Sequence, residues 1–84
     1  MNEIKKLLEQ GKQLIGSDRT LKELRKGNVT KVYVSTNASK SLLEDLEYYK
    51  EIGGVELISL NMNSEELGTF CKKPFRISVI GALK

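Results

Sequence analysis

The 84-residue chain contains no histidine and a single cysteine, so most of the usual catalytic and metal-binding side chains are missing. Without histidine, neither a Ser-His-Asp triad nor a Cys-His nucleophile pair can be assembled. One cysteine can form no disulfide within the chain, and it leaves too few nitrogen and sulfur ligands for a zinc site. Because Cys71 stands in an apolar helical pattern, we expect it to be a small buried hydrophobic residue.

Phosphate-binding loops and paired catalytic acids are absent as well. No segment matches G-x-x-x-x-G-K-S/T or G-x-G-x-x-G, the loops that hold nucleotide phosphates. The adjacent acids Glu44-Asp45 and Glu65-Glu66 fall in expected helices, where a solvated surface is the simpler role. The sequence therefore predicts a protein that is not an enzyme and that uses no cofactor or metal ion.

Long apolar stretches, linkers and repeats are also missing. No run is long enough to cross a bilayer, and the N-terminus does not resemble a secretory leader. A chain of this length suits one modest hydrophobic core rather than two. We therefore expect residues 1–84 to form one soluble, monomeric domain located in the cytoplasm.

What the chain does have is an uneven distribution of charge. Residues 1–40 carry nine Lys/Arg against four Asp/Glu, residues 41–70 carry one against seven, and residues 71–84 carry four against none. The total is +3, with a pI near 9.1. Two basic segments around an acidic one can give a domain one basic face, a common feature of polyanion-binding proteins, although a charge run can also be simply a solvated surface.

Apolar spacing and turn residues predict alternating helices and strands. Helices are expected at 2–11, from the turn at 16–18 to about 26, at 41–52 after a Ser41–Glu44 capping box, and after Asn63, with Glu66 completing a second box. Strands are expected at 14–15, 31–36, 55–60 and 76–80. This order predicts an α/β fold, a three-layer α/β/α sandwich with a mixed sheet of about four strands.

A cationic turn precedes the expected last strand, and it offers groups that suit a nucleic acid: Lys72, Lys73, Phe75 and Arg76. The cations can meet phosphates, and the ring can stack on an unstacked base. Alternatively, this is a solvated loop in which Phe75 fills the core. Because Ile77, Val79 and Leu83 can supply the apolar alternation of the strand, we favour an outward Phe75. Four loops, at 16–20, 36–38, 61–63 and 72–76, are expected to collect at one end of the sheet.

Three motifs in order resemble the ribosomal L-seven-Ae and L-thirty-e superfamily of kink-turn RNA-binding proteins. They are Ile-Gly-Ser-Asp-Arg-Thr-Leu-Lys at 15–22, Asp-Leu-Glu-Tyr-Tyr at 45–49, and Asn-Ser-Glu-Glu-Leu-Gly-Thr at 63–69, which continues through Phe75-Arg76. The similarity covers nearly the whole chain. It is strongest to the archaeal and eukaryotic large-subunit L-thirty-e branch.

The resemblance implies an α/β/α sandwich that clamps a sharply bent, internally looped RNA by shape, stacking and phosphate neutralisation. It also implies a ribosomal or ribosome-associated protein, with ribosomal RNA and other ribonucleoprotein components as partners. The RNA-binding residues that it implies lie in three segments: Gly16, Ser17, Asp18, Arg19 and Lys22; Thr36, Asn37 and Ala38; and Lys72, Lys73, Pro74, Phe75 and Arg76.

Several of these assignments have alternatives. Gly16 is either a turn glycine or the opening of an anion site at a helix N-terminus. Asp18 is either a helix cap, the role that we favour, or an RNA ligand that accepts from a guanine edge. Relatives often carry Asn or a cation at that position, and they commonly have glycine at the position of Lys72. We expect Tyr48 and Tyr49 to pack the helix and Leu67 to lie in the core.

The competing function is a non-RNA protein-interaction module on the same fold. RNA binding requires the two basic segments to converge in space. An adaptor predicts instead that they diverge or are neutralised by Glu44, Asp45 and Glu47.

Overall fold

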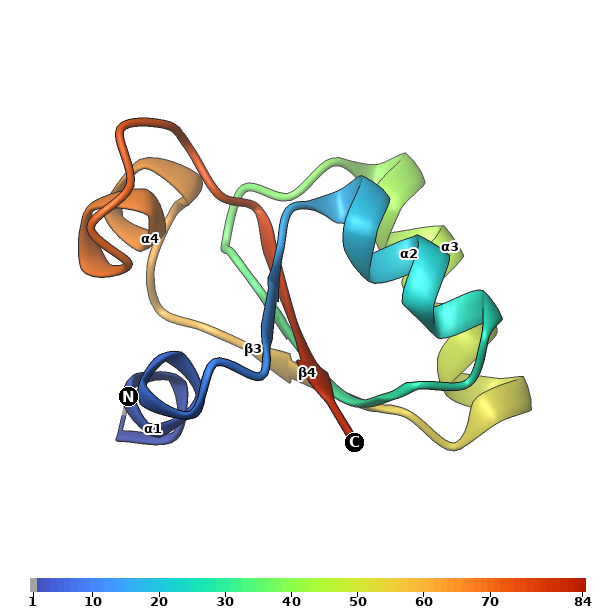
Figure 1. The fold of residues 1–84 in the computed structure, drawn as a ribbon. Helices are drawn as coiled ribbons and strands as arrows, with labels where there is room; N and C mark the ends of the chain where they lie inside the picture. The colour runs from blue at the N-terminus through green and yellow to red at the C-terminus, as the bar shows by residue number, and fades with distance from the viewer. Residues whose placement is uncertain (1) are drawn as a thin grey trace.

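A mixed four-stranded sheet lies between two pairs of helices in the computed structural model, which describes residues 2–84 (Figure 1). The elements run α1 (Asn2–Gln10), β1 (Gln13–Ile15), α2 (Ser17–Arg25), β2 (Val29–Val34), α3 (Lys40–Gly53), β3 (Glu56–Ser59), α4 (Ser64–Phe70) and β4 (Val79–Leu83). This confirms the expected α/β/α sandwich. None of the helices within residues 2–84 combines the length and apolar character that a membrane span requires.

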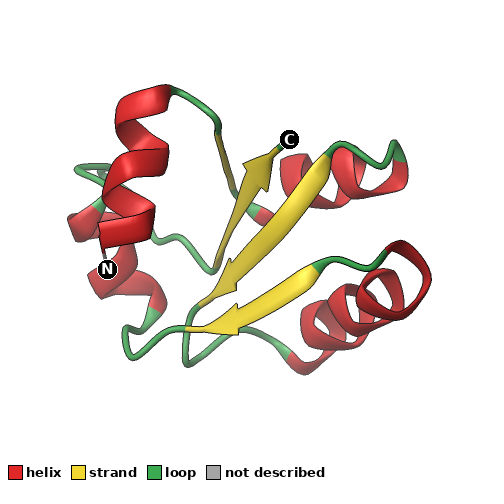
Figure 2. Ribbon diagram, turned by 90° about the horizontal axis from the view of Figure 1, so that it is seen from below, coloured by secondary structure: helices red, strands yellow, loops and turns green. Residues whose placement is uncertain are grey.

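The last strand occupies an inner position in the sheet. The strand order is β1-β4-β2-β3, with β4 antiparallel to both β1 and β2, while β2 and β3 are parallel. Figure 2 shows the strands side by side, with helices on both faces. β1 and β3 are therefore the outer strands of the sheet.

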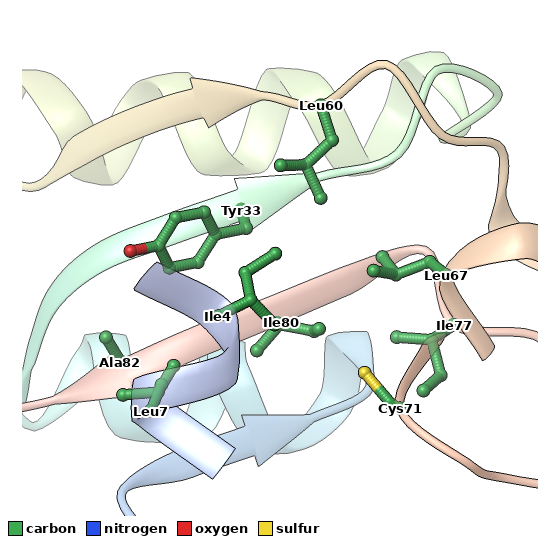
Figure 3. Packing of buried hydrophobic residues seen from close by; sticks show 9 residues of the cluster. All are labelled: Ile4, Leu7, Tyr33, Leu60, Leu67, Cys71, Ile77, Ile80 and Ala82. Carbon is green, nitrogen blue, oxygen red and sulfur yellow. The ribbon is translucent and has the colours of Figure 1, made fainter. Parts of the chain in front are cut away.

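Residue alternation along the inner strands gives each face of the sheet its own core. One cluster joins α1 and α4 to the sheet and includes Ile4, Leu7, Tyr33, Leu67, Cys71, Ile77 and Ile80 (Figure 3). The other cluster joins α2 and α3 to the opposite face and includes Leu24, Val32, Val34, Leu46 and Val79. Successive strand side chains point to opposite faces, so Val32 and Val34 separate from Tyr33. The predictions of a buried Cys71 and a core Leu67 are confirmed.

Several strand boundaries differ from the sequence prediction: β2 spans 29–34 rather than 31–36, β4 spans 79–83 rather than 76–80, and β1 and β3 differ by one residue at their ends. Two of these differences arise because neighbouring residues bond outside the ladders. β2 ends at Val34 rather than 36, and the Thr36 N–H donates to the Met62 carbonyl over 2.9 Å. β4 begins at Val79 rather than 76, and the Ile77 N–H donates to the Ser64 carbonyl over 3.0 Å. Ile77 is thus held against the start of α4, while the Ser78 carbonyl accepts from the Ser35 N–H over 2.9 Å, before the strand begins.

One predicted capping box is confirmed and the other is wrong. In α4 the Glu66 N–H donates to Asn63 Oδ1 over 2.8 Å, and the Asn63 N–H donates to Glu66 Oε1 over 3.1 Å. In α3 the cap is Ser39, whose Oγ accepts from the Leu42 N–H over 3.2 Å. α3 therefore begins before Ser41, which lies inside the helix. The expected packing is confirmed for Tyr49, which packs against the core, and wrong for Tyr48, which is 59% exposed.

Candidate nucleic-acid interface

The four predicted loops meet at one end of the sheet, where the β3–α4 loop joins the β2–α3 loop through the Thr36 N–H, which donates to the Met62 carbonyl. β1 ends at Ile15 and β2 ends at Val34, and these residues pair with Ile80 and Val79 at the start of β4. The register therefore brings the start of α2, the β2–α3 loop and the α4–β4 loop to the same end, as Figure 1 shows. The convergence of the α2 and α4–β4 segments brings the two basic parts of the sequence together.

Gly16 turns the chain from β1 into α2. Its N–H donates to the Val79 carbonyl over 3.1 Å, and its carbonyl accepts from Thr20 Oγ1 over 2.8 Å. Its φ of 103° and ψ of 154° belong to a region that is almost exclusive to glycine. Thr20 is fully buried and packs closely on Gly81 of β4. The turn is thus fixed by backbone and core contacts, and Gly16 is a turn glycine with the positive φ that this role needs.

The first turn of α2 lacks a side-chain cap. Gly16 occupies the N-cap position with no side-chain hydrogen bond, and Asp18 lies inside the helix. The prediction that Asp18 caps the helix is therefore wrong, although an acid in the first turn complements the helix dipole. Ser17 is half-buried, whereas Asp18, Arg19 and Lys22 are exposed. The first N–H groups of α2 consequently lie beside two exposed cations.

A glycine in α4 sets the path of the α4–β4 loop. A Cβ on Gly68 would collide with the Phe75 carbonyl oxygen, so the loop backbone lies directly on the helix. The Lys73 N–H donates to the Gly68 carbonyl over 2.9 Å. Lys72 adopts a left-handed conformation with a φ of 58°. Glycine adopts this conformation most readily, and glycine is the residue that the resemblance implied for this position. The loop is held against α4 by its backbone, which leaves its side chains free to face outward.

Phe75 faces solvent. Its side chain is 54% exposed, while Ile77 and Val79 fill the core beside it with 1% and 0% exposure. The preference for an outward Phe75 is confirmed, and the alternative of a core residue is wrong. The other loop side chains, Lys72, Lys73, Pro74 and Arg76, are exposed as well.

The β2–α3 loop is tied to the start of α4 through Asn37. Asn37 Oδ1 accepts from the Ser64 N–H over 2.8 Å and from Ser35 Oγ over 3.2 Å, while Asn37 Nδ2 donates to Ser64 Oγ over 3.1 Å. Ala38 is half-buried against the α2–α3 core. The amide of Asn37 is thus occupied within the protein, whereas the Thr36 side chain is exposed and makes no such bond to the described residues.

An open groove of about 390 Å³ gathers side chains from the converging segments. It is lined by Gln13, Ile15, Arg19, Lys73 and Phe75. A neighbouring groove continues from Arg19 to Lys22 along α2. Arg76 lines an adjoining groove on the α4 side that shares Lys73 and Phe75 but not Arg19, and its Nη2 is 4.0 Å from Glu65 Oε2. The structure therefore unites Arg19, Lys73 and Phe75.

Sequence reasoning missed Gln13 and Ile15 as parts of this groove. Both belong to β1, which is too short for its residue alternation to indicate which side chains face the groove. Gln13 Oε1 is buried without a hydrogen-bond partner. The only signal available was the adjacency of this short strand to the Gly16 turn.

The acidic segment leaves the groove cations unpaired. Among the side chains of residues 4–84, no ion pair within 4.0 Å involves Glu44, Asp45 or Glu47, or the groove cations Arg19 and Lys73. Glu23, beside Lys22, accepts from Asn28 and pairs with Lys26, and the Asn28 hydrogen bond lowers the pKa of its carboxyl.

Burial raises the pKa of the Cys71 thiol, so it stays protonated at neutral pH. No cluster of three or more His, Cys, Asp or Glu side chains suited to a metal ion occurs in the described part of the chain.

Proteins of similar sequence include two large ribosomal subunit proteins. The large ribosomal subunit protein eL30 of Sulfurisphaera tokodaii is 37% identical over 82 residues, which cover 98% of this chain and 77% of the relative. The eL30 protein of Sulfolobus acidocaldarius is 38% identical over 79 residues, covering 94% and 76%. These relatives are ribosomal proteins, which confirms the prediction that the chain is not an enzyme.

Solved structures share the fold at lower identity. A protein of unknown function from Bacillus halodurans C matches with a TM-score of 0.81 at 22% identity, covering 93% of this chain and 77% of that one. The Giardia lamblia 15.5kD RNA binding protein matches with a TM-score of 0.79 at 20% identity, covering 96% and 68%. A profile of the ribosomal protein L7Ae/L30e/S12e/Gadd45 family matches residues 1–84, and the chain belongs to this family.

Proposed function

We propose that this chain is a ribosome-associated RNA-binding protein that recognises a kink-turn-like bent internal loop by its shape. The observation that carries the proposal is the groove in which Arg19, Lys73 and Phe75 come together beside the uncapped start of α2. The eL30 relatives are components of the large ribosomal subunit, so ribosomal RNA is the partner that we propose.

Each part of the groove has a physical role in this proposal. The first N–H groups of α2 point toward the ligand side and suit a phosphate, with Arg19 and Lys22 adding charge. Phe75 offers an exposed ring to a nucleotide that leaves the helical stack. Lys73 meets the backbone next to that nucleotide. A continuous duplex offers no such unstacked base, so the bent loop is favoured.

The remaining predicted residues fall into two proposed groups: residues that contact RNA and residues that hold the loops in position. Ser17, Thr36, Lys72, Pro74 and Arg76 are proposed as flanking contacts. Gly16, Asn37 and Ala38 act mainly by holding the loops, because their backbone or side chains are committed within the protein. Asp18 is exposed next to Arg19, so we propose that it accepts from a guanine edge rather than contacting phosphate.

A specific observation also favours the alternative, a protein-interaction module. α3 exposes Tyr48 and Ile52 on one face among its acids, with exposures of 59% and 64%, while the 39% exposed Leu43 lies on another face of the helix. This surface lies on a different part of the molecule from the groove and carries the opposite charge, so it could serve a protein partner alongside RNA.

Competition between two RNAs of matched length tests the proposed function. One RNA carries a kink-turn internal loop, and the other is the same sequence with the loop converted to Watson–Crick pairs. We expect tighter binding to the kinked RNA at every salt concentration, with the affinity of both falling as salt rises. Equal affinity for the two RNAs would reduce the interaction to nonspecific charge attraction and contradict the proposal.

A further inference from the structure

A second groove adjoins the first along the outer edge of β1. It lies between α1 and the end of α4 and has a volume of about 370 Å³. Figure 1 shows these two helices on the same side of the sheet. Gln13 and Lys73 line both grooves. Because β1 is an outer strand, no other strand within residues 2–84 covers this edge. The two grooves form one surface that leads from α2 past the α4–β4 loop to α1.

Cations predominate along this second groove. Lys5 comes from α1, and Lys72 and Lys73 come from the loop, while Glu9 is the one acid among the lining residues. None of these three lysines takes part in an ion pair within the described residues. The left-handed conformation of Lys72 is unusual for a residue other than glycine, and it brings an exposed lysine into the wall of the groove. Unpaired lysines of this kind bind phosphates without reading bases.

The floor of the groove is apolar and uncharged. It includes the half-buried side chains of Leu8 and Phe70 and the buried Cys71, whose thiol stays protonated. At the junction with the first groove, Gln13 Oε1 has no hydrogen-bond partner among the described residues, so a turn of this side chain would offer an acceptor without breaking a bond to that oxygen. A ribose 2′-hydroxyl can donate to such an acceptor, which a DNA backbone cannot do.

We propose that the second groove carries the sugar-phosphate backbone of one of the two stems that flank the bent RNA loop. The inference rests on the proposed function and extends the RNA surface to α1, a helix that the sequence did not associate with binding. Lys5, Lys72 and Lys73 neutralise successive phosphates of that stem, so the contact adds affinity but no sequence preference.

The test compares Lys5→Ala with Lys6→Ala, an exposed neighbour on α1 that does not line the groove. Three RNAs are titrated at several salt concentrations: the full kink-turn RNA and two versions in which one or the other stem is cut back to the pairs beside the loop. Thermal melts first establish that both variants are folded.

With the full RNA, Lys5→Ala is expected to reduce the slope of log K against log salt by about 1 and to weaken binding several-fold at low salt. Lys6→Ala keeps the slope of the unmodified protein. With one of the two truncated RNAs, Lys5→Ala binds as well as the unmodified protein, because the stem that Lys5 contacts is gone.

If the unmodified protein still prefers kinked RNA, two results would overturn this inference and leave the proposed function in place. One is an equal effect of the two lysine substitutions, and the other is a loss at Lys5 that is the same with all three RNAs. No preference of the unmodified protein for kinked over paired RNA would overturn the proposed function as well.

Discussion

Phe75 is the residue whose role is most open to measurement. Phe75→Ala is expected to cost about 1–3 kcal/mol of RNA-binding free energy, the range for base–aromatic stacking, and to leave the melting temperature nearly unchanged. The second expectation follows from its 54% exposure, since little packing is lost on truncation. Fluorescence titration and thermal melts measure the two quantities.

A matched control for Phe75 exists on α3. Tyr48 is an aromatic residue of similar exposure that lies outside the groove, so Tyr48→Ala should leave RNA affinity as it was. Should Phe75→Ala bind RNA like the unmodified protein, or Tyr48→Ala lose as much affinity, stacking at Phe75 would be refuted.

Gly16 illustrates a conformational requirement rather than a steric one. A Cβ at this position would meet no atom within 4 Å, yet the φ of 103° is strained for any other residue. Gly16→Ala should therefore lower the free energy of unfolding by about 1–3 kcal/mol, and RNA affinity should fall less once the variant is fully folded. Denaturant unfolding of Gly16→Ala beside Gly53→Ala gives the comparison, because Gly53 lies in α3 without a positive φ.

At the scale of elements, the contact between α4 and its following loop holds the side chains that we propose to bind RNA in place. Gly68→Ala would drive a methyl group into the Phe75 carbonyl, so the loop must shift away from the helix. We expect a loss of about 1–3 kcal/mol in stability together with weakened RNA binding, since Lys73 and Phe75 move together. Thr69→Ala, at the exposed next position, should affect both far less. If Gly68→Ala is destabilised but binds RNA with full affinity, binding does not depend on the path of the loop, and this prediction is contradicted.

At the scale of the whole molecule, local patterns predicted the elements, and long-range contacts decided their ends. Asn63 and Glu66 are three residues apart, so their capping box could be predicted from the sequence alone. The end of β2 depends on a bond between Thr36 and Met62, and no local pattern indicates that bond. The same difference between local patterns and long-range contacts applies to the site. The exposure of Phe75 was predicted from its apolar neighbours, whereas Gln13 reaches the groove only through the packing of β1.

The charge pattern carried more information about the site than any single motif. Two basic segments far apart in the sequence meet because β1 and β4 are paired, while the acidic α3 lies in the other helix layer from α1 and α4. The sequence predicted one basic face, but only the strand order fixes which cations share it. Arg76 is the example, since it belongs to the basic loop yet lies beside Glu65 rather than Arg19.

The central claim is that RNA lies in the groove between the start of α2 and the α4–β4 loop. Backbone amide chemical shifts, followed by NMR while a kink-turn RNA is added, test it most directly. The account predicts large changes at residues 16–22 and 72–76 and at Lys5, with the exposed face of α3 around Tyr48 unchanged. Changes concentrated on α3, with those loops silent, would contradict it.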